Sequence, residues 1–139
     1  MDLMRPAGKS VVIQLANRLK FVLRPLTTMA TYEQVKDVPN HPDVYLIDVR
    51  RKEELQQTGF IPASINIPLD ELDKALNLDG SAFKNIYGRS KPEKQSQIIF
   101  TCRSGNRVLE AEKIAKSQGY SNVVIYKGSW NEWAQKEGL

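Results

Sequence analysis

The chain has 139 residues, of which 41% are hydrophobic and 26% charged, and a formal net charge of +4 at pH 7. This length suits one domain with its own core, and no apolar run reaches the ~20 residues that a membrane-spanning helix needs. Residues 1–28 hold five basic residues and one acid, whereas residues 29–139 hold equal numbers of each. A body without net charge argues against a nucleic-acid-binding domain, so we expect no nucleic-acid partner and no membrane span.

A basic amphipathic segment, residues 1–28, precedes the domain that we expect over residues 29–139. Within residues 9–24, apolar side chains recur at the helical period and acids are absent. This pattern is typical of a mitochondrial presequence, and a helix that packs on the domain is the structural alternative. Met29 also offers a second translation start, so the sequence leaves both a mitochondrial and a cytoplasmic location open.

From Thr31 onward, short apolar runs alternate with helical patterns. Strands are expected over the ranges 44–47, 64–67, 97–101 and 123–126, and helices over 51–57, 69–76, 83–87, 106–118 and 130–135. In helix 106–118 the residues expected to point inward are Val108, Leu109, Ala111, Ile114 and Ala115. Strands that alternate with helices predict an α/β fold, a small parallel sheet flanked by helices on both faces.

Cys102 is the single cysteine of the chain, and it follows the strand expected at 97–101. Ligands of parallel α/β sheets bind where strands end and helices begin. The loop after the cysteine combines arginines with residues that permit tight turns, namely Arg103, Ser104, Gly105, Asn106 and Arg107. Inward-turned backbone N–H groups, a helix N-terminus and two guanidinium groups would bind an anion and favour the thiolate of Cys102. The alternative is a small, buried, unreactive cysteine.

Three motifs, in chain order, resemble those of the rhodanese family. The first runs from Asp48-Val49-Arg50 and Glu53 to Gly59-Phe60-Ile61-Pro62-Ala63-Ser64-Ile65-Asn66-Ile67-Pro68, the second is Cys102–Arg107, and the third is Gly128-Ser129-Trp130 with Trp133. Together they cover roughly residues 30–139 and imply a rhodanese-like fold. Two positions depart from the family pattern, because Phe60 stands where histidine is usual and Ser129 where a second glycine is common.

The resemblance implies a sulfurtransferase with Cys102 as nucleophile. Cys102 would take the outer sulfur of thiosulfate, or of a similar small donor, and hold it as a persulfide. The loop from Arg103 to Arg107 would bind the donor, with Arg107 as the main charge and Arg103 as the second. The acceptor would be cyanide, glutathione or a protein thiol such as that of a thioredoxin-like protein, and no metal or organic cofactor is required.

Three other functions remain open. Phosphatases and arsenate reductases related to rhodanese place arginine after a cysteine and five residues, whereas here four residues separate Cys102 from Arg107. The shorter loop favours sulfur over a tetrahedral phosphate group. Some rhodanese domains serve as non-catalytic binding modules, but these usually lack the cysteine or the loop charges. Proteolysis by a Cys–His pair would need His41, the single histidine, which sits in a turn before the first expected strand.

Several charged and aromatic residues look functional but are expected to be structural. Asp48 and Arg50 would form an ion pair or an N-cap that fixes the strand-to-helix turn. Trp130 and Trp133 would anchor the last helix to the core. The charged run from Arg50 to Glu54 would form a solvated helix face.

Overall fold

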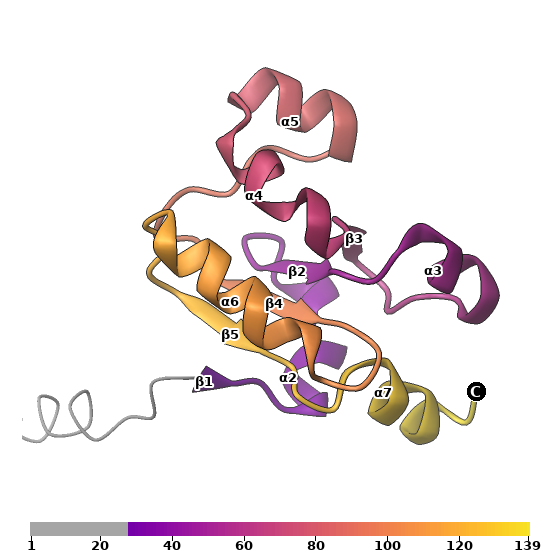
Figure 1. Cartoon of the computed structure of the whole chain (residues 1–139). Coiled ribbons are helices and arrows are strands. Elements are labelled where there is room, and N and C mark those ends of the chain that lie inside the picture. The colour runs from indigo at the N-terminus through magenta and orange to yellow at the C-terminus, as the bar shows by residue number, and fades with distance from the viewer. Residues whose placement is uncertain (1–27) are drawn as a thin grey trace, which may run out of the picture.

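The computed structural model describes residues 28–139 and has a parallel five-stranded sheet at its centre (Figure 1). The strands are β1 (Thr28–Met29), β2 (Tyr45–Asp48), β3 (Ser64–Asn66), β4 (Ile98–Thr101) and β5 (Val123–Ile125). They lie in the order β1-β5-β4-β2-β3, and every neighbouring pair is parallel. All strands therefore end at one edge of the sheet, where the last residues of β2 and β4 are paired.

Helices cover both faces of this sheet (Figure 1). They are α2 (Tyr32–Lys36), the 3-10 helix η1 (Val38–Asn40), α3 (Lys52–Thr58), α4 (Leu69–Asn77), α5 (Gly80–Tyr87), α6 (Arg107–Ser117) and α7 (Ser129–Glu137). One hydrophobic cluster joins α4, α5 and α6 to the sheet, and a second joins α2, η1 and α7 to its other face. In the part of the chain described, no helix is both long enough and apolar enough to cross a membrane.

The alternation of side chains along the strands decides which layer each residue enters. In β4, Ile98 and Phe100 belong to the cluster of α6, whereas Ile99 belongs to the cluster of α7. Cys102 continues the first set, two residues beyond Phe100, and is 1% exposed. The sequence thus points the cysteine into the layer that contains α6.

The predicted α/β fold and its main elements are confirmed, with boundary shifts of one to three residues. Three short elements, β1, α2 and η1, were not predicted: β1 has two residues, and α2 and η1 have five and three, too few for an apolar helical period to show. The prediction for Leu109 is wrong, since this side chain is 41% exposed and Glu112, bonded to Lys116, is buried in its place. The inward positions of α6 follow Val108, and Leu109 lies about 100° further around the helix. The helix expected at residues 9–24 lies outside the described residues.

Candidate active site

The turn from β2 to α3 is built around a buried ion pair between Asp48 and Arg50. Nη2 of Arg50 lies 2.9 Å from Oδ2 of Asp48, and the two side chains are 0% and 1% exposed. Arg50 also donates to Oγ1 of Thr58 at 2.9 Å and to the carbonyl of Gly59 at 3.1 Å. The pair therefore fastens the C-terminal end of α3 to the end of β2. The predicted ion pair is confirmed, and the N-cap alternative is wrong because Arg51 occupies that position.

The loop after β4 points a backbone N–H at the cysteine sulfur. The amide of Gly105 donates to Sγ of Cys102 at 3.1 Å. Gly105 has a φ of +91°, and a Cβ there would lie 2.1 Å from the carbonyl oxygen of Lys127, so only glycine fits. Ser104 and Asn106 are exposed and do not share this left-handed backbone, so the turn depends on Gly105 alone.

The segment before α7 supports the same loop from the other side. Nζ of Lys127 donates to the carbonyl of Gly105 at 2.9 Å. The amides of Trp130 and Asn131 donate to the carbonyls of Cys102 and Arg103 at 2.9 and 3.0 Å. Sequence reasoning missed Lys127, because the contact depends on β4 and β5 lying side by side. Trp130 and Trp133 are 7% and 5% exposed, which confirms that they anchor α7.

Arg107 forms a two-pronged ion pair with Glu54 of α3. Its Nη1 and Nη2 lie 2.6 and 2.9 Å from the two carboxylate oxygens. These hydrogen bonds lower the pKa of Glu54 to about 2, and the same contact raises the pKa of Arg107. The expected solvated face is therefore wrong for two members of its run, since Arg50 is buried and Glu54 binds the cysteine loop. A glutamate in the first turn of a helix at the sheet's carboxyl edge was the available signal.

The loop retains donors that its own contacts do not use. Nε of Arg103 is buried and has no hydrogen-bond partner within residues 28–139. The pair with Glu54 uses two of the five N–H donors of the Arg107 guanidinium. An unpartnered buried donor costs free energy, which an anionic ligand would recover. The arrangement can therefore bind a small anion next to a cysteine.

A cavity of about 630 Å³ opens beside the Glu54–Arg107 pair. It is lined by Val49, Arg51, Glu54, Leu69, Asp70, Arg107, Glu110 and Ile114. The apolar part of the lining comes from Val49 after β2, Leu69 of α4 and Ile114 of α6, and the other lining residues are charged. The space lies at the carboxyl edge of the sheet, where parallel α/β folds bind their ligands.

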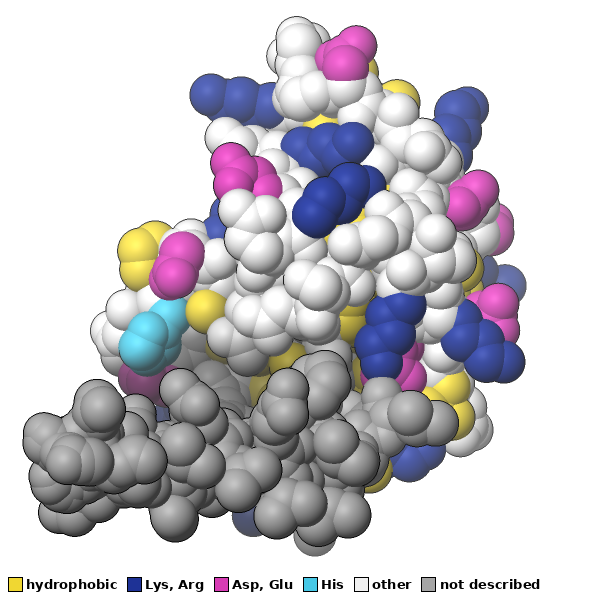
Figure 2. Space-filling view, turned by 90° about the vertical axis from the view of Figure 1, so that its left-hand side faces the viewer, with side chains coloured by type: hydrophobic (Ala, Val, Ile, Leu, Met, Phe, Trp, Pro, Cys, Tyr) yellow, Lys and Arg dark blue, Asp and Glu magenta, His cyan; other side chains and the backbone are white. Residues whose placement is uncertain are grey.

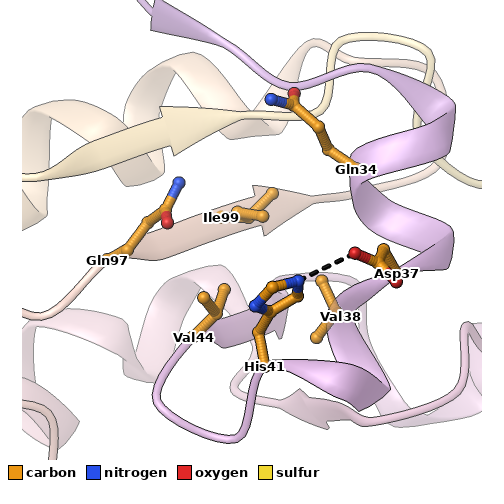
Figure 3. Close-up of a pocket in the computed structure, with 7 residues that line it drawn as sticks. All are labelled: Gln34, Asp37, Val38, His41, Val44, Gln97 and Ile99. Carbon is orange, nitrogen blue, oxygen red and sulfur yellow. Dashed lines mark hydrogen bonds and ion pairs between the residues drawn. The ribbon is translucent and has the colours of Figure 1, made fainter.

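His41 lies at the opposite, amino-terminal edge of the sheet, in a second cavity of about 180 Å³ (Figure 3). Its Nε2 lies 2.8 Å from Oδ2 of Asp37, and its side chain is 55% exposed. Figure 2 views this edge and shows acidic and hydrophobic side chains next to the histidine, with most basic side chains of this face farther away. Since His41 precedes β2 and Cys102 follows β4, the two residues flank opposite ends of parallel strands. The Cys–His alternative is therefore wrong.

Comparison with known proteins gives a consistent result. The Rhodanese-like domain family profile matches residues 31–136. The chain is 98% identical over 111 residues to Rhodanese domain-containing protein CG4456 of Drosophila melanogaster, which covers 80% of this chain and 100% of the relative. It is 38% identical over 123 residues to thiosulfate sulfurtransferase RDL2, mitochondrial, of Saccharomyces cerevisiae, covering 84% of this chain and 82% of that protein.

A human relative and a solved structure extend this similarity. Thiosulfate:glutathione sulfurtransferase of Homo sapiens is 40% identical over 93 residues, which are 66% of this chain and 80% of that protein. The structure of the human single-domain sulfurtransferase TSTD1 superposes with a TM-score of 0.73 at 32% identity, covering 79% of this chain and 97% of the other. The relatives that carry a named activity here are sulfurtransferases.

Proposed function

Because this chain belongs to the rhodanese family, we propose that it is a sulfurtransferase that uses thiosulfate or a similar small donor. The observation that carries the proposal is the amide of Gly105, which donates to Sγ of Cys102 at 3.1 Å inside a loop that also holds two arginines. A hydrogen bond from a fixed backbone donor stabilises negative charge on sulfur. Cys102 is thereby prepared to act as a thiolate nucleophile.

In the first half-reaction, the Cys102 thiolate attacks the outer sulfur of thiosulfate. A bond forms between Sγ and that sulfur while the S–S bond of thiosulfate breaks, and its electron pair leaves with sulfite. Arg103 and Arg107, with the N–H groups at Ser104 and Asn106, bind the sulfonate oxygens and stabilise the departing anion, while the amide of Gly105 stays on Sγ of Cys102. The product is a persulfide on Cys102, whose negative charge lies on the outer sulfur.

In the second half-reaction, an acceptor removes the outer sulfur. The acceptor thiolate or cyanide bonds to this sulfur, the S–S bond of the persulfide breaks, and its electron pair returns to Sγ of Cys102. Glutathione is the acceptor that we favour, supported by the name of the human relative, thiosulfate:glutathione sulfurtransferase. Cyanide and protein thiols, including those of thioredoxin-like proteins, are the other acceptors to compare. The residues named need no metal or organic cofactor for either step.

The direct test is the mass of the intact protein after exposure to thiosulfate. A mass increase of about 32 Da, one sulfur atom, is expected and should disappear on adding glutathione. Since the chain has one cysteine, Cys102→Ser should show neither the adduct nor any transfer to cyanide. Wild-type protein without an adduct would contradict the proposal. Cys102-dependent hydrolysis of an aryl phosphate would support the phosphatase alternative. Inactivity in both the sulfur-transfer and the phosphatase assay would support a non-catalytic binding module.

We further propose that the full chain enters mitochondria. The basic segment over residues 1–28 and the yeast relative named as mitochondrial support this location. Fluorescent fusions of the full chain and of a form that begins at Met29 test it. The first is expected in mitochondria and the second in the cytoplasm, and a cytoplasmic full chain would refute the targeting role.

A further inference from the structure

Ser129 opens α7 directly behind the cysteine, in a backbone conformation that serine rarely adopts. Its φ is +54°, and its side chain is 0% exposed. Glycine adopts such a φ without steric cost, whereas a residue with a Cβ is strained there. A strained serine persists where its surroundings or its function require the side chain. The hydroxyl of Ser129 is therefore a candidate for a role at Cys102.

The hydroxyl of Ser129 contacts the cysteine at two atoms. Its Oγ accepts the backbone N–H of Cys102 at 3.0 Å and lies 3.7 Å from Sγ of Cys102. It also lies 2.8 Å from the carbonyl oxygen of Tyr126, to which it can donate. A hydroxyl has one proton and two lone pairs, so that proton can go to the carbonyl or to the sulfur. Rotation about a single bond exchanges the two arrangements.

Hydrogen bonds hold the Ser129 side chain in place and leave the direction of its O–H bond free to change. Two amides of the first turn of α7, those of Trp130 and Asn131, donate to the carbonyls of Cys102 and Arg103 at 2.9 and 3.0 Å. The amide of Ser129 itself donates to the carbonyl of Tyr126 at 3.1 Å. These bonds fix the backbone of Ser129 against the cysteine loop, and the amide of Cys102 holds Oγ itself at 3.0 Å. Only the direction of the O–H bond remains to respond to charge on the sulfur.

We propose that Ser129 is a catalytic hydrogen-bond donor that turns its proton to Sγ of Cys102 whenever that sulfur carries negative charge. The inference rests on the proposed function, in which Sγ is charged as a free thiolate and uncharged in the persulfide. Ser129 donates to the carbonyl of Tyr126 in the persulfide state. When the acceptor breaks the S–S bond, the proton turns to Sγ and stabilises the leaving thiolate.

The other charged groups around the cysteine stay unchanged when Ser129 is replaced. They are Arg103 and Arg107 on the loop, Glu54 on α3, Asp48 and Arg50 after β2, and Lys127 before α7. The amide of Gly105 also keeps its bond to the sulfur. A change in the pH dependence of Cys102 reactivity on substitution at position 129 is then due to the missing hydroxyl.

Two substitutions separate the hydroxyl from the strain. Ser129→Gly removes the hydroxyl and relieves the strained backbone, and this relief offsets part of the cost of leaving the Cys102 amide without its acceptor, so the variant is expected to be folded. Ser129→Ala removes the hydroxyl and keeps the strain. Thr101→Val is the matched control, because Oγ1 of Thr101 is buried one residue before Cys102 and has no partner within residues 28–139. Its removal breaks no hydrogen bond among the residues that the structure describes.

The first measurement is the rate of alkylation of Cys102 by iodoacetamide as a function of pH. The pH of half-maximal rate should rise by about 0.5–1 unit in both Ser129 variants and stay constant in Thr101→Val, because a donor to the thiolate is lost. The second is single-turnover kinetics at a pH where Cys102 is fully ionised. Release of sulfur to cyanide should slow about 3- to 10-fold, while loading from thiosulfate should change less.

An unchanged alkylation profile in a folded Ser129→Gly variant would overturn the proposal. Equal slowing of loading and release, with that profile unchanged, would also overturn it and assign Ser129 a structural role. Alkylation uses no sulfur donor, so it reports on Ser129 even in a chain that transfers no sulfur. Failure of the proposed function appears separately, as the missing adduct of about 32 Da on the wild-type protein.

Discussion

Two arginine–carboxylate pairs lie at the carboxyl edge of the sheet and differ in their surroundings. In the pair of Asp48 and Arg50, the side chains are 1% and 0% exposed. In the pair of Glu54 and Arg107, they are 16% and 33% exposed. The first joins residues two apart in one turn, and the second joins α3 to α6 across 53 residues. The same chemical contact thus occurs once inside the core and once at the mouth of the cavity.

Burial gives the two pairs different tasks. Arg50 uses Nε, Nη1 and Nη2 for bonds within the protein and also lies 5.1 Å from the ring centroid of Trp130. The described contacts of the Arg107 guanidinium go to Glu54, on the wall of a cavity. A fully enclosed pair stabilises one conformation, whereas a half-open pair leaves charge for a ligand. Substitutions should therefore affect stability in the first pair and donor use in the second.

The largest expected effect is the loss of stability in Arg50→Met. Removing the guanidinium leaves the Asp48 carboxylate buried without a partner, which costs about 3–5 kcal/mol of unfolding free energy. Urea unfolding followed by circular dichroism measures this loss. The matched control is Arg51→Met, one residue along the chain and exposed, which should change stability by less than about 0.5 kcal/mol. A loss below about 1 kcal/mol in Arg50→Met would show that burial does not distinguish the two pairs.

The sequence predicted the first pair and missed the second for a physical reason. Asp48 and Arg50 are two residues apart at the end of an apolar run, so their contact follows from local geometry. Glu54 meets Arg107 only because α3 and the start of α6 both lie where the adjacent strands β2 and β4 end. Parallel pairing was expected, but the direction in which α3 leaves β2 depends on the buried Arg50. No local pattern contains that information.

The cysteine and its loop were predictable from the sequence, whereas the contacts that α7 makes with them were not. Cys102, Gly105 and the two arginines follow from one strand–loop–helix pattern. Ser129 was noted only as a departure from the family pattern, and its φ of +54° and contact with Cys102 emerge from the packing of α7. The prediction for Leu109 was wrong for the opposite reason. The apolar pattern of α6 was compatible with two choices of inward face, and the structure buries the face that contains Glu112.

The second prediction concerns donor use in Arg107→Ala. We expect KM for thiosulfate to rise about 10- to 100-fold, because an anion loses a guanidinium that would contact it. Transfer from a neutral organic trisulfide should change little, and unfolding free energy should fall by about 1 kcal/mol or less, as for a partly exposed pair. Steady-state kinetics with both donors and urea unfolding give these values.

Arg107→Lys is the control for this prediction. It keeps the charge and loses the planar fork, so KM for thiosulfate should fall between those of the wild type and Arg107→Ala. Equal losses with thiosulfate and with the neutral trisulfide would show that Arg107 acts on the cysteine rather than on the donor. A stability loss as large as that of Arg50→Met would remove the distinction between the two pairs.

The smallest expected effects are those of Glu54→Gln, which tests the half-open pair from its acidic side. The pKa of Glu54 is lowered to about 2 on folding by the hydrogen bonds of Arg107. A carboxylate with a depressed pKa adds stability that is complete above its unfolded pKa of about 4.3 and is lost as the pH falls toward 2. Glu54→Gln should therefore cost about 0.5–1 kcal/mol at pH 7, and the cost should shrink steadily below about pH 4.

The same substitution should lower KM for thiosulfate about 2- to 5-fold, because the glutamine no longer competes as an anion for the Arg107 guanidinium. Glu53→Gln is the matched control, since Glu53 is exposed on the same turn of α3, and it should change neither value. Urea unfolding from pH 7 to pH 2.5 and thiosulfate kinetics at pH 7 measure both effects. A cost that stays constant with pH would mean that Glu54 acts through packing or its bond to the Arg51 amide. The carboxylate would then have no electrostatic hold on Arg107, and its charge would be free to meet the donor without competition.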